Sequence, residues 1–540
     1  MSHTTGPVVL AVAPSIPGSD TDTFLGRLQN IGVLYLAAAL EAAGVEVVTL
    51  DRQYSRDSPL KLAAEIIRLR PSLVGFTLYD HTIQTTWQVL SILRWDYKGP
   101  VVVGGYTPTF HARDILQTCP NVDYVVMREG EAAIVALVEH LRGRRAVEDV
   151  PNLVYRTAID IRFNPEGRLG DVGELPWPRR DWSDDAPLTP LVTRRGCLSR
   201  CSFCSMVPFY DKQFGPPVRW RPPQDVVDEI EHCLEHGSDE FILYDDDFGM
   251  STQAERTWCR ELVGEIRKRN LHFRWLIETR VMDVVRGGSL VEELMSVGMR
   301  HVSMGMESML PRQLKLYNKG YTQADVYKAI EVLERVGVDY QTNVIFWDPW
   351  LTMPEAIEHI ELLEQIHIGN QLANANFPWF ANLLTARKGT QIHTVLQEAG
   401  LLTLQPGTFW DYRYEFVSPE IKAFYYGPFQ GFNRRSRRMM PRPSALWIAV
   451  VQLEHQGNLH TAALLRRYAR TISETETAYL KQLFIAVHES SGLADSNAAA
   501  KSVHEEFTPR IQACGRMLAG VDLGPDAWPA PAKAQVARHG

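Results

Sequence analysis

Short apolar runs alternate with helical patterns through the first part of the chain, and this alternation restricts the fold more than any other feature. The runs at 7–13, 45–50, 72–78, 101–103 and 124–127 have the length and composition of buried strands. Helical patterns follow them at 32–43, 60–70, 82–93, 112–118 and 132–141. Apolar strands joined by helices form parallel sheets that are covered on both faces. We therefore predict an α/β domain with a doubly wound parallel sheet at residues 1–145.

The alternation resumes after a Pro-rich linker, which we predict at 146–187. Strands are expected at 191–193, 240–244, 273–277, 301–304 and 340–346, and a sixth within 371–384. These units predict a partial (β/α)6 barrel over 188–400, with functional groups at the carboxyl ends of its strands. Helical patterns at 442–455, 458–471 and 473–490 predict a mostly helical C-terminal substrate or cap domain at 401–522. The Ala- and Pro-rich tail at 523–540 is predicted to be disordered.

Three cysteines, Cys197, Cys201 and Cys204, form a C-x3-C-x2-C segment just after the first barrel strand. A disulfide framework explains them poorly, because three is an odd number and the chain holds only 7 cysteines in 540 residues. A structural zinc site needs four ligands, usually as two separated pairs, and no second C-x2-C or H-x3-H pair occurs. Three thiolates suit a [4Fe–4S] cluster in which one iron lacks a protein ligand. We therefore predict that these cysteines are the metal ligands.

The segment TRRGCLSRCSFC at 193–204 resembles the cluster-binding loop of radical S-adenosylmethionine enzymes. In that family three cysteines hold the cluster, and S-adenosylmethionine chelates the fourth iron. The resemblance implies reductive cleavage of S-adenosylmethionine to a 5′-deoxyadenosyl radical. It also implies that Phe203, the aromatic residue before the last cysteine, lies near the adenine.

Polar residues stand at the ends of the predicted barrel strands. Asp245 and Asp246 resemble the family's DDxF motif, and a solvated acidic turn is the alternative. An arginine fork at position 280 suits the methionyl carboxylate, and an internal Glu–Arg ion pair is the alternative. The segment Gly305–Ser308 resembles the family's GxE(S) motif, and Asn343 either faces the barrel interior or satisfies backbone groups. The resemblance implies cofactor contacts from Asp245, Asp246, Glu278, Arg280, Glu307, Ser308 and Asn343.

The first domain resembles the cobalamin-binding domain found before many radical S-adenosylmethionine domains. The resemblance rests on VVVGGYTPTF at 101–110 and VDYVVMREGEAAI at 122–134. Glycine permits close approach of a ligand to the backbone. A glutamate pair at a helix start also has a simpler explanation in the helix dipole. The resemblance implies cobalamin contacts from Thr77, Leu78, Tyr79, Gly104, Gly105, Thr107, Glu129 and Gly130.

One departure from the cobalamin-binding pattern concerns the lower axial ligand. Proteins that replace the lower base with histidine carry DxHxxG after the first strand, whereas this loop is PSIPGS at 14–19. His81 has the wrong spacing and is interpreted as a loop or surface histidine. The sheet therefore either binds cobalamin without a histidine ligand, which we favour, or has lost the cofactor.

Composition limits the remaining classes of function. The net charge of −8 and the isoelectric point near 6.1 do not support a general nucleic-acid binder. We see no apolar run long enough to span a bilayer and no secretory signal. Free thiols and an oxygen-sensitive cluster suit a reducing compartment, so we expect a cytoplasmic protein. Its expected partners are a small-molecule substrate and an external electron donor of the flavodoxin or ferredoxin type.

The leading hypothesis is a cobalamin-dependent radical S-adenosylmethionine C-methyltransferase. Family chemistry implies two molecules of S-adenosylmethionine per turnover. One methylates the cobalamin and the other yields the radical that abstracts hydrogen from an unactivated substrate carbon. The alternatives are oxidative rearrangement, ring contraction or cyclisation with the same cofactors, and a non-enzymatic cobalamin or redox sensor. The charged residues at successive strand ends disfavour the sensor.

Overall fold

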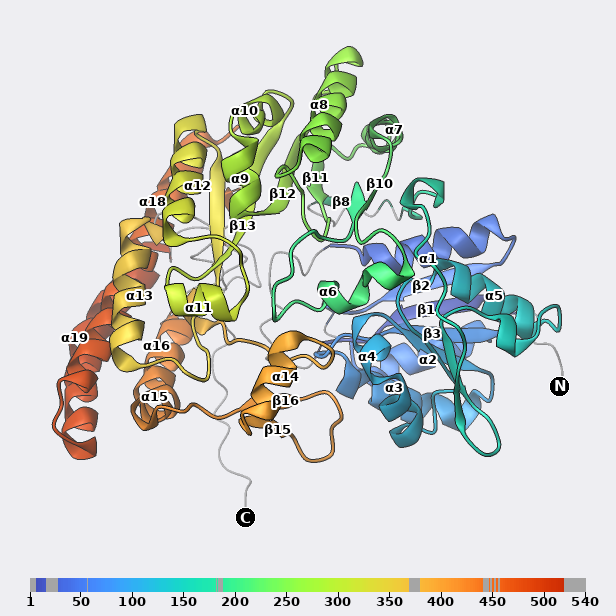
Figure 1. Ribbon diagram of the computed structural model, residues 1–540, viewed down its shortest axis with the longest axis horizontal. Helices are drawn as coiled ribbons and strands as arrows, with labels where there is room; N and C mark the ends of the chain where they lie inside the picture. The colour runs from blue at the N-terminus through green and yellow to red at the C-terminus, as the bar shows by residue number, and fades with distance from the viewer. Residues whose placement is uncertain are drawn as a thin grey trace.

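A computed structural model describes residues 6–15, 28–55, 57–180, 182, 188–368, 379–439, 446, 449–450, 453–454 and 457–518 of the chain. Figure 1 shows the N-terminal sheet and the barrel on either side of the short helix α6 (Met206–Phe209), with a long helical pair at the far edge of the barrel. Within these residues no helix is long and apolar enough to cross a membrane.

The N-terminal domain is the doubly wound sheet that the sequence predicts. Five parallel strands lie in the order β2-β1-β3-β4-β5. Their bounds are Val8–Val12, Val47–Asp51, Leu73–Thr77, Val101–Gly104 and Tyr124–Val126 for β1 to β5. Helices α1 to α5 span Ile31–Ala42, Pro59–Leu69, Ile83–Asp96, Tyr106–Thr118 and Glu131–Leu141. In this strand order the topological switch point lies between β1 and β3, where such sheets bind ligands.

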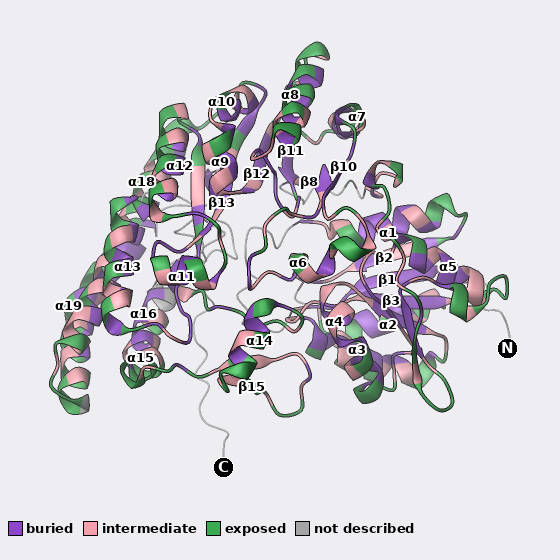
Figure 2. Ribbon diagram, in the orientation of Figure 1, coloured by how far each residue is buried: buried purple, intermediate pink, exposed green. Residues whose placement is uncertain are grey.

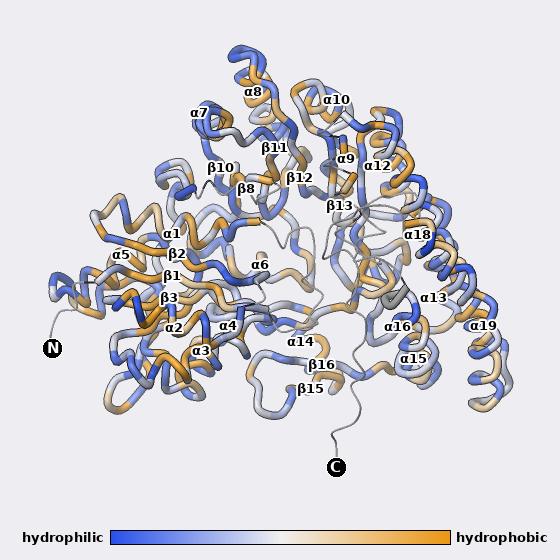
Figure 3. The backbone as a smooth tube through the Cα atoms, turned by 180° about the vertical axis from the view of Figure 1, so that it is seen from behind, coloured by the Kyte–Doolittle hydropathy of each residue, from blue (hydrophilic) through white to orange (hydrophobic). Residues whose placement is uncertain are grey.

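The segment expected as a linker contributes to this sheet. β6 (Leu153–Arg156) pairs antiparallel with β5, and β7 (Ile161–Phe163) pairs antiparallel with β6. Leu153 and Val154 are fully buried, which explains why this short apolar run joins the sheet rather than staying in a connection. Figure 3 shows hydrophobic residues concentrated along the strands of the N-terminal sheet.

The barrel contains five parallel strands in the order β14-β13-β12-β11-β8. They span Thr189–Leu191 (β8), Glu240–Leu243 (β11), Arg274–Arg280 (β12), Met299–Glu307 (β13) and Asp339–Val344 (β14). The helices are α7 (Pro223–Glu235), α8 (Gln253–Lys268), α9 (Val281–Gly287), α10 (Leu290–Met295), α11 (Pro311–Leu316), α12 (Gln323–Val336) and α13 (Met353–Gln365). Residues 371–378 of the segment predicted to hold the sixth strand lie outside the described residues, and beyond them Leu383 forms a parallel bridge with Trp347.

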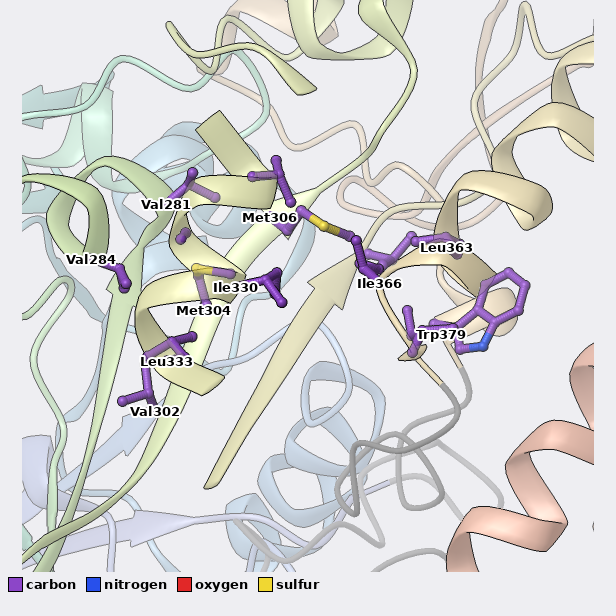
Figure 4. Close-up of a cluster of buried hydrophobic side chains, with 14 of the residues drawn as sticks. Val281, Val284, Val302, Met304, Met306, Ile330, Leu333, Leu363, Ile366 and Trp379 are labelled. Atoms are coloured by element: carbon purple, nitrogen blue, oxygen red, sulfur yellow. The ribbon is translucent and has the colours of Figure 1, made fainter. Parts of the chain in front are cut away.

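Side chains alternate across each barrel strand, and this alternation positions the site. In β13, Val302, Met304 and Met306 are buried against the surrounding helices (Figure 4). Because strand side chains alternate, Ser303 and Glu307 point to the opposite, inner face, where Gly305 leaves the backbone uncovered. Buried residues line the strands of both sheets, while the outer helix faces are exposed (Figure 2). The inner face of β13 therefore carries the polar residues, whereas Ile242 and Leu276 of the neighbouring strands belong to a small apolar cluster with Leu28 and Leu188.

The C-terminal domain begins with α14 (Gln391–Glu398) and the hairpin β15–β16 (Leu402–Leu404 and Tyr412–Tyr414). α15 (Pro419–Phe424), a π-helical turn (Tyr425–Phe429) and α16 (Gln430–Met439) follow, then α18 (Leu459–His488) and α19 (Leu493–Leu518). α18 replaces the two helices predicted at 458–471 and 473–490, because the buried residues Ile472 and Ser473 continue its packed face without a break. The tail at 523–540 and most of 442–455 lie outside the described residues.

Aromatic side chains of α15 and of the π-helical turn are part of the hydrophobic core. Phe424 and Phe429 are buried against Trp347 of the barrel, with ring centroids 6.3 and 4.8 Å from it. Phe484 of α18 lies 5.8 Å from the same tryptophan. These aromatic contacts attach the C-terminal helices to the barrel.

Candidate cofactor site between the sheet and the barrel

The three predicted ligands lie in a loop at residues 196–218, called the cluster loop here. It leaves the barrel after β9 (Arg194–Arg195) and returns at β10 (Arg219–Trp220), which pairs antiparallel with β9. Cys197, Cys201 and Cys204 are all free thiols. Burial raises the pKa of Cys204 to about 11, and burial and the Asp247 carboxylate raise that of Cys197. Cys201 is buried and the other two are partly buried. Because a bound metal ion deprotonates its thiols, these three sulfurs, none of them in a disulfide, fit an iron–sulfur cluster.

The acidic run after β11 holds the cluster loop in place. Asp245 is buried, and its carboxylate accepts hydrogen bonds from the Thr193 and Arg194 amides at 2.7 and 3.1 Å. Asp246 accepts from the Gly196 amide at 2.7 Å. Burial raises the pKa of Asp245 to about 6 and also raises that of Asp246. Asp245, predicted as a cofactor contact, is thus bonded to the strand that enters the loop.

Arg280 and Glu278 extend from the end of β12. Arg280 donates to Ser199 in the cluster loop at 2.6 Å and forms ion pairs with Asp247 and Asp283 at 2.9 and 2.7 Å. The alternative of an internal ion pair therefore applies to Arg280, although its partners are aspartates rather than Glu278. Within the described part of the chain, the carboxyl group of Glu278 has no hydrogen-bond partner. Burial and the neighbouring Asp246 and Asp245 raise the pKa of Glu278 to about 7.

Lys319 is a site residue that the sequence does not reveal. Its side chain is 4% exposed, and its ammonium group lies 3.4 Å from the Glu307 carboxylate. The same ammonium lies 5.7 Å from the ring centroid of Phe203, a residue that lies between Cys201 and Cys204 in the sequence. Glu307 itself has a left-handed backbone with φ of 67°, which is unusual for a residue other than glycine. The sequence signal is only a lysine in an Asn-Lys-Gly turn, which ordinarily faces solvent.

Two other predicted barrel residues have clear protein partners. Ser308 is buried, donates to the Gln313 side chain at 2.5 Å and accepts from the Leu310 amide at 2.9 Å. Its hydroxyl therefore shapes the turn after β13, which differs from the predicted cofactor contact. Asn343 is exposed on the inner face and donates to Ser303 at 3.3 Å.

A cavity of about 260 Å³, called the interdomain cavity here, lies where the sheet meets the barrel. Of the residues predicted to contact cobalamin, it is lined by Thr77, Tyr79, Gly104, Gly105, Glu129 and Gly130. From the barrel side it is lined by Tyr244 and Asp246, and Tyr106 at the start of α4 also borders it. The Tyr106 hydroxyl lies 3.5 Å from the Asp246 carboxylate and 3.1 Å from the Met206 sulfur, which links the N-terminal domain to the end of β11 and to the cluster loop.

The cavity wall fits close approach of a ligand to the backbone. Gly105 has φ of 106°, and a Cβ there would lie 3.4 Å from the Thr77 side chain. A Cβ at Gly130 would lie 3.0 Å from Leu36. This backbone-lined wall is the part of the cavity that would hold cobalamin, if cobalamin binds here.

Leu78 and Thr107 do not line this cavity. Leu78 is fully buried in the helix-covered core on the other face of the sheet. Thr107 donates to the Asp80 carboxylate at 2.7 Å. Both predictions came from the resemblance to the cobalamin-binding domain, and a sequence resemblance does not define the direction of a side chain.

His81 contacts polar side chains beside the N-terminal sheet. Its ring stacks on Tyr79 at 5.6 Å, and its Nε2 lies 3.0 Å from Gln53 Nε2. Burial lowers its pKa. It borders a second, open groove of about 1120 Å³ rather than the interdomain cavity. Residues 16–19 of the loop that lacks the histidine motif lie outside the described residues.

Two family models match the chain. Residues 20–138 match the B12 binding domain, and residues 191–363 match the radical SAM superfamily. The chain therefore carries the two domains of cobalamin-binding radical S-adenosylmethionine enzymes. These domains imply a [4Fe–4S] cluster, S-adenosylmethionine and cobalamin as cofactors, in agreement with the three thiols and the glycine-lined cavity.

Relatives within this family carry out different reactions. An anaerobic magnesium-protoporphyrin IX monomethyl ester cyclase of Cereibacter sphaeroides is 30% identical over 58% of this chain and 52% of its own length. A hopanoid C-3 methylase of Methylococcus capsulatus is 25% identical over 63% of this chain and 65% of its own length. The chain thus spans about half to two thirds of these family members.

Solved structures of the family share the fold. The cobalamin-dependent S-adenosylmethionine radical enzyme OxsB, solved with aqua-cobalamin and S-adenosylmethionine bound, matches 95% of this chain and 79% of its own. That match has a TM-score of 0.72 at 15% identity. The radical S-adenosylmethionine methyltransferase TsrM of Kitasatospora setae matches 68% of this chain and 70% of its own, with a TM-score of 0.55 at 19% identity.

Proposed function

We propose that the protein is a C-methyltransferase that modifies an unactivated carbon of a small-molecule, natural-product substrate. The observation that supports this most is the interdomain cavity, which is bordered by the glycine pair of the cobalamin-type sheet and by Asp246, the partner of the cluster loop. A substrate at this junction contacts both domains. The methylases among the relatives, including a bacteriochlorophyllide d C-8(2)-methyltransferase of Chlorobaculum tepidum at 24% identity, support methyl transfer.

The residues of the chain bind and orient the reactants. Arg280 at the end of β12 and Lys319 in the turn before α12 are cations near the cluster loop, so they suit the methionyl carboxylate of S-adenosylmethionine. Glu307 suits its ribose hydroxyls. Ser303, Gln341 and Asn343 form a polar group on the inner face and suit hydrogen bonds to substrate. When bound, the cluster supplies the electron that cleaves S-adenosylmethionine, and cobalamin carries the methyl group. An external one-electron donor of the flavodoxin or ferredoxin type reduces the cluster.

Anaerobic turnover with S-adenosylmethionine that carries a trideuteromethyl group tests this function. The substrates are the small molecules made by the enzymes of neighbouring genes. We expect a product that gains one trideuteromethyl group in place of hydrogen, with equal amounts of S-adenosylhomocysteine and 5′-deoxyadenosine. A product that has only lost hydrogen, with 5′-deoxyadenosine but no S-adenosylhomocysteine, contradicts methyl transfer.

The second candidate function is oxidative cyclisation or rearrangement with the same cofactors. The specific observation in its favour is that cyclases of Cereibacter sphaeroides and Rubrivivax gelatinosus are 30% and 29% identical to the chain. The same experiment separates the two functions, because product mass distinguishes a gained methyl group from lost hydrogen. A serine variant of Cys204 should abolish 5′-deoxyadenosine formation under either function and serves as the common control.

A further inference from the structure

The short β9–β10 ribbon that closes the cluster loop is called the neck here, and it places two arginines directly opposite each other. Arg195 and Arg219 are paired residues in the antiparallel β9–β10 ribbon, at the start and end of the loop. The neck is tight, because a Cβ at Gly196 would lie 1.7 Å from the Pro217 carbonyl oxygen. Like charges directly opposite each other on neighbouring strands destabilise the pairing. The closed neck therefore needs negative charge from elsewhere.

One carboxylate of the N-terminal domain meets both arginines. Glu129 accepts from Arg195 at 3.1 Å and from both terminal nitrogens of Arg219 at 2.7 and 2.9 Å. Glu131 adds a second contact to Arg195 at 2.5 Å. All four side chains are at most 14% exposed. The Glu129 side chain is therefore the main electrostatic support of the neck.

The same residues form part of the wall of the interdomain cavity. Glu129, Gly130, Glu131 and Arg195 all border it. Arg195 and Arg219 also lie over the rings of Tyr35 and Tyr210, at 5.1 and 5.5 Å, and both tyrosines line the cavity. A ligand in the cavity thus touches the groups that hold the neck, and Arg195 is two residues from Cys197.

We propose that Glu129 is a positioning residue that couples the two cofactor sites, so that cobalamin in the interdomain cavity stabilises the cluster loop. Filling the cavity restricts the Glu129 carboxylate to the geometry that pairs with both arginines. By thermodynamic linkage, an assembled cluster then strengthens cobalamin binding by the same factor. The sequence resemblance implies a cobalamin contact for Glu129, whereas the structure directs its carboxylate to the cluster loop. This inference depends on the two cofactors and not on which reaction they perform.

Chelation of iron from the reconstituted enzyme tests the coupling. A ferrous chelator is added with and without saturating hydroxocobalamin, and iron release is followed by absorbance. In the wild type we expect cobalamin to slow iron release about fivefold or more, within the usual range of site-to-site coupling. In Glu129→Gln the ratio of the two rates should fall close to one. The ratio is the readout, because a merely structural loss would change both rates together.

Glu139→Gln is the matched control, since Glu139 lies on helix α5, which begins just after Glu129, but pairs with Arg145 at the surface. It should keep the wild-type ratio. If Glu129→Gln does not fold, Glu131→Gln removes only the second contact to Arg195 and should give an intermediate ratio. The reverse measurement is the dissociation constant of hydroxocobalamin with and without the cluster, which should be lower with the cluster in the wild type and unaffected by the cluster in Glu129→Gln. A wild-type ratio of one, or an unchanged ratio in the Glu129 or Glu131 variant, overturns the proposal.

Discussion

Replacing Glu278 by glutamine is expected to stabilise the cofactor-free protein, and to do so more at about pH 8 than at about pH 5. Burial, with Asp246 and Asp245 nearby, raises the pKa of this carboxyl group from 4.5 to about 7. Between those values the unfolded chain has released a proton that the folded protein still holds. The free energy of unfolding therefore falls as pH rises through this window. The difference in pKa between the folded and unfolded states corresponds to about 3 kcal/mol of unfolding free energy. Because the side chain is partly exposed, we expect the glutamine variant to gain about 1–2 kcal/mol of stability.

Urea unfolding of the apoprotein, followed by circular dichroism at several pH values, measures this effect. Glutamine has the same shape as glutamate and no charge, so the stability of the variant and the wild type should diverge only as pH rises. Glu307→Gln is the contrasting control at the next strand end. It should destabilise the protein, because it leaves the buried Lys319 ammonium without its carboxylate. A Glu278→Gln difference that does not depend on pH, or a loss of stability at about pH 8, refutes the reasoning.

Three further predictions concern the ligands and the cavity. Cys204→Ala should lose most of its iron and sulfide after reconstitution, measured by metal analysis, whereas alanine at the isolated, buried Cys119 should retain them. Gly105→Ala forces a side chain into a backbone conformation with φ of 106° at a cost of about 1–3 kcal/mol, so cobalamin affinity measured by absorbance titration should fall about tenfold or more. Lys319→Met should cost about 3–5 kcal/mol in urea unfolding by leaving Glu307 unpaired, and the Lys319→Met/Glu307→Gln double variant should recover part of it.

The sequence predicts the fold well where local pattern decides it. The five parallel strands of the first sheet and the five described barrel strands all contain or overlap the predicted apolar runs. The clearest differences come from long-range contacts. β6 and β7 join the first sheet only because an edge strand accepts them, and α18 continues past residue 471 because it packs along α19.

The candidate site divides in a similar way. Spacing identified Cys197, Cys201 and Cys204, because ligands close in sequence must also be close in space. It did not define what the neighbouring side chains contact. Ser308 bonds to Gln313, and Leu78 enters the core, although both stand at strand ends where ligand contacts were expected.

The sequence by itself determined two α/β units, a three-thiol loop and a glycine-lined strand end, since each depends on residues within one short segment. The tertiary structure decided which charged groups meet across the domains. Lys319 is buried beside Glu307, and Glu129 pairs with Arg195 and Arg219 from another domain. Such pairs join residues far apart in the chain, and their burial depends on how the two domains pack. Periodicity and spacing in the sequence contain no information about which distant residues pair or about how deeply the pairs are buried.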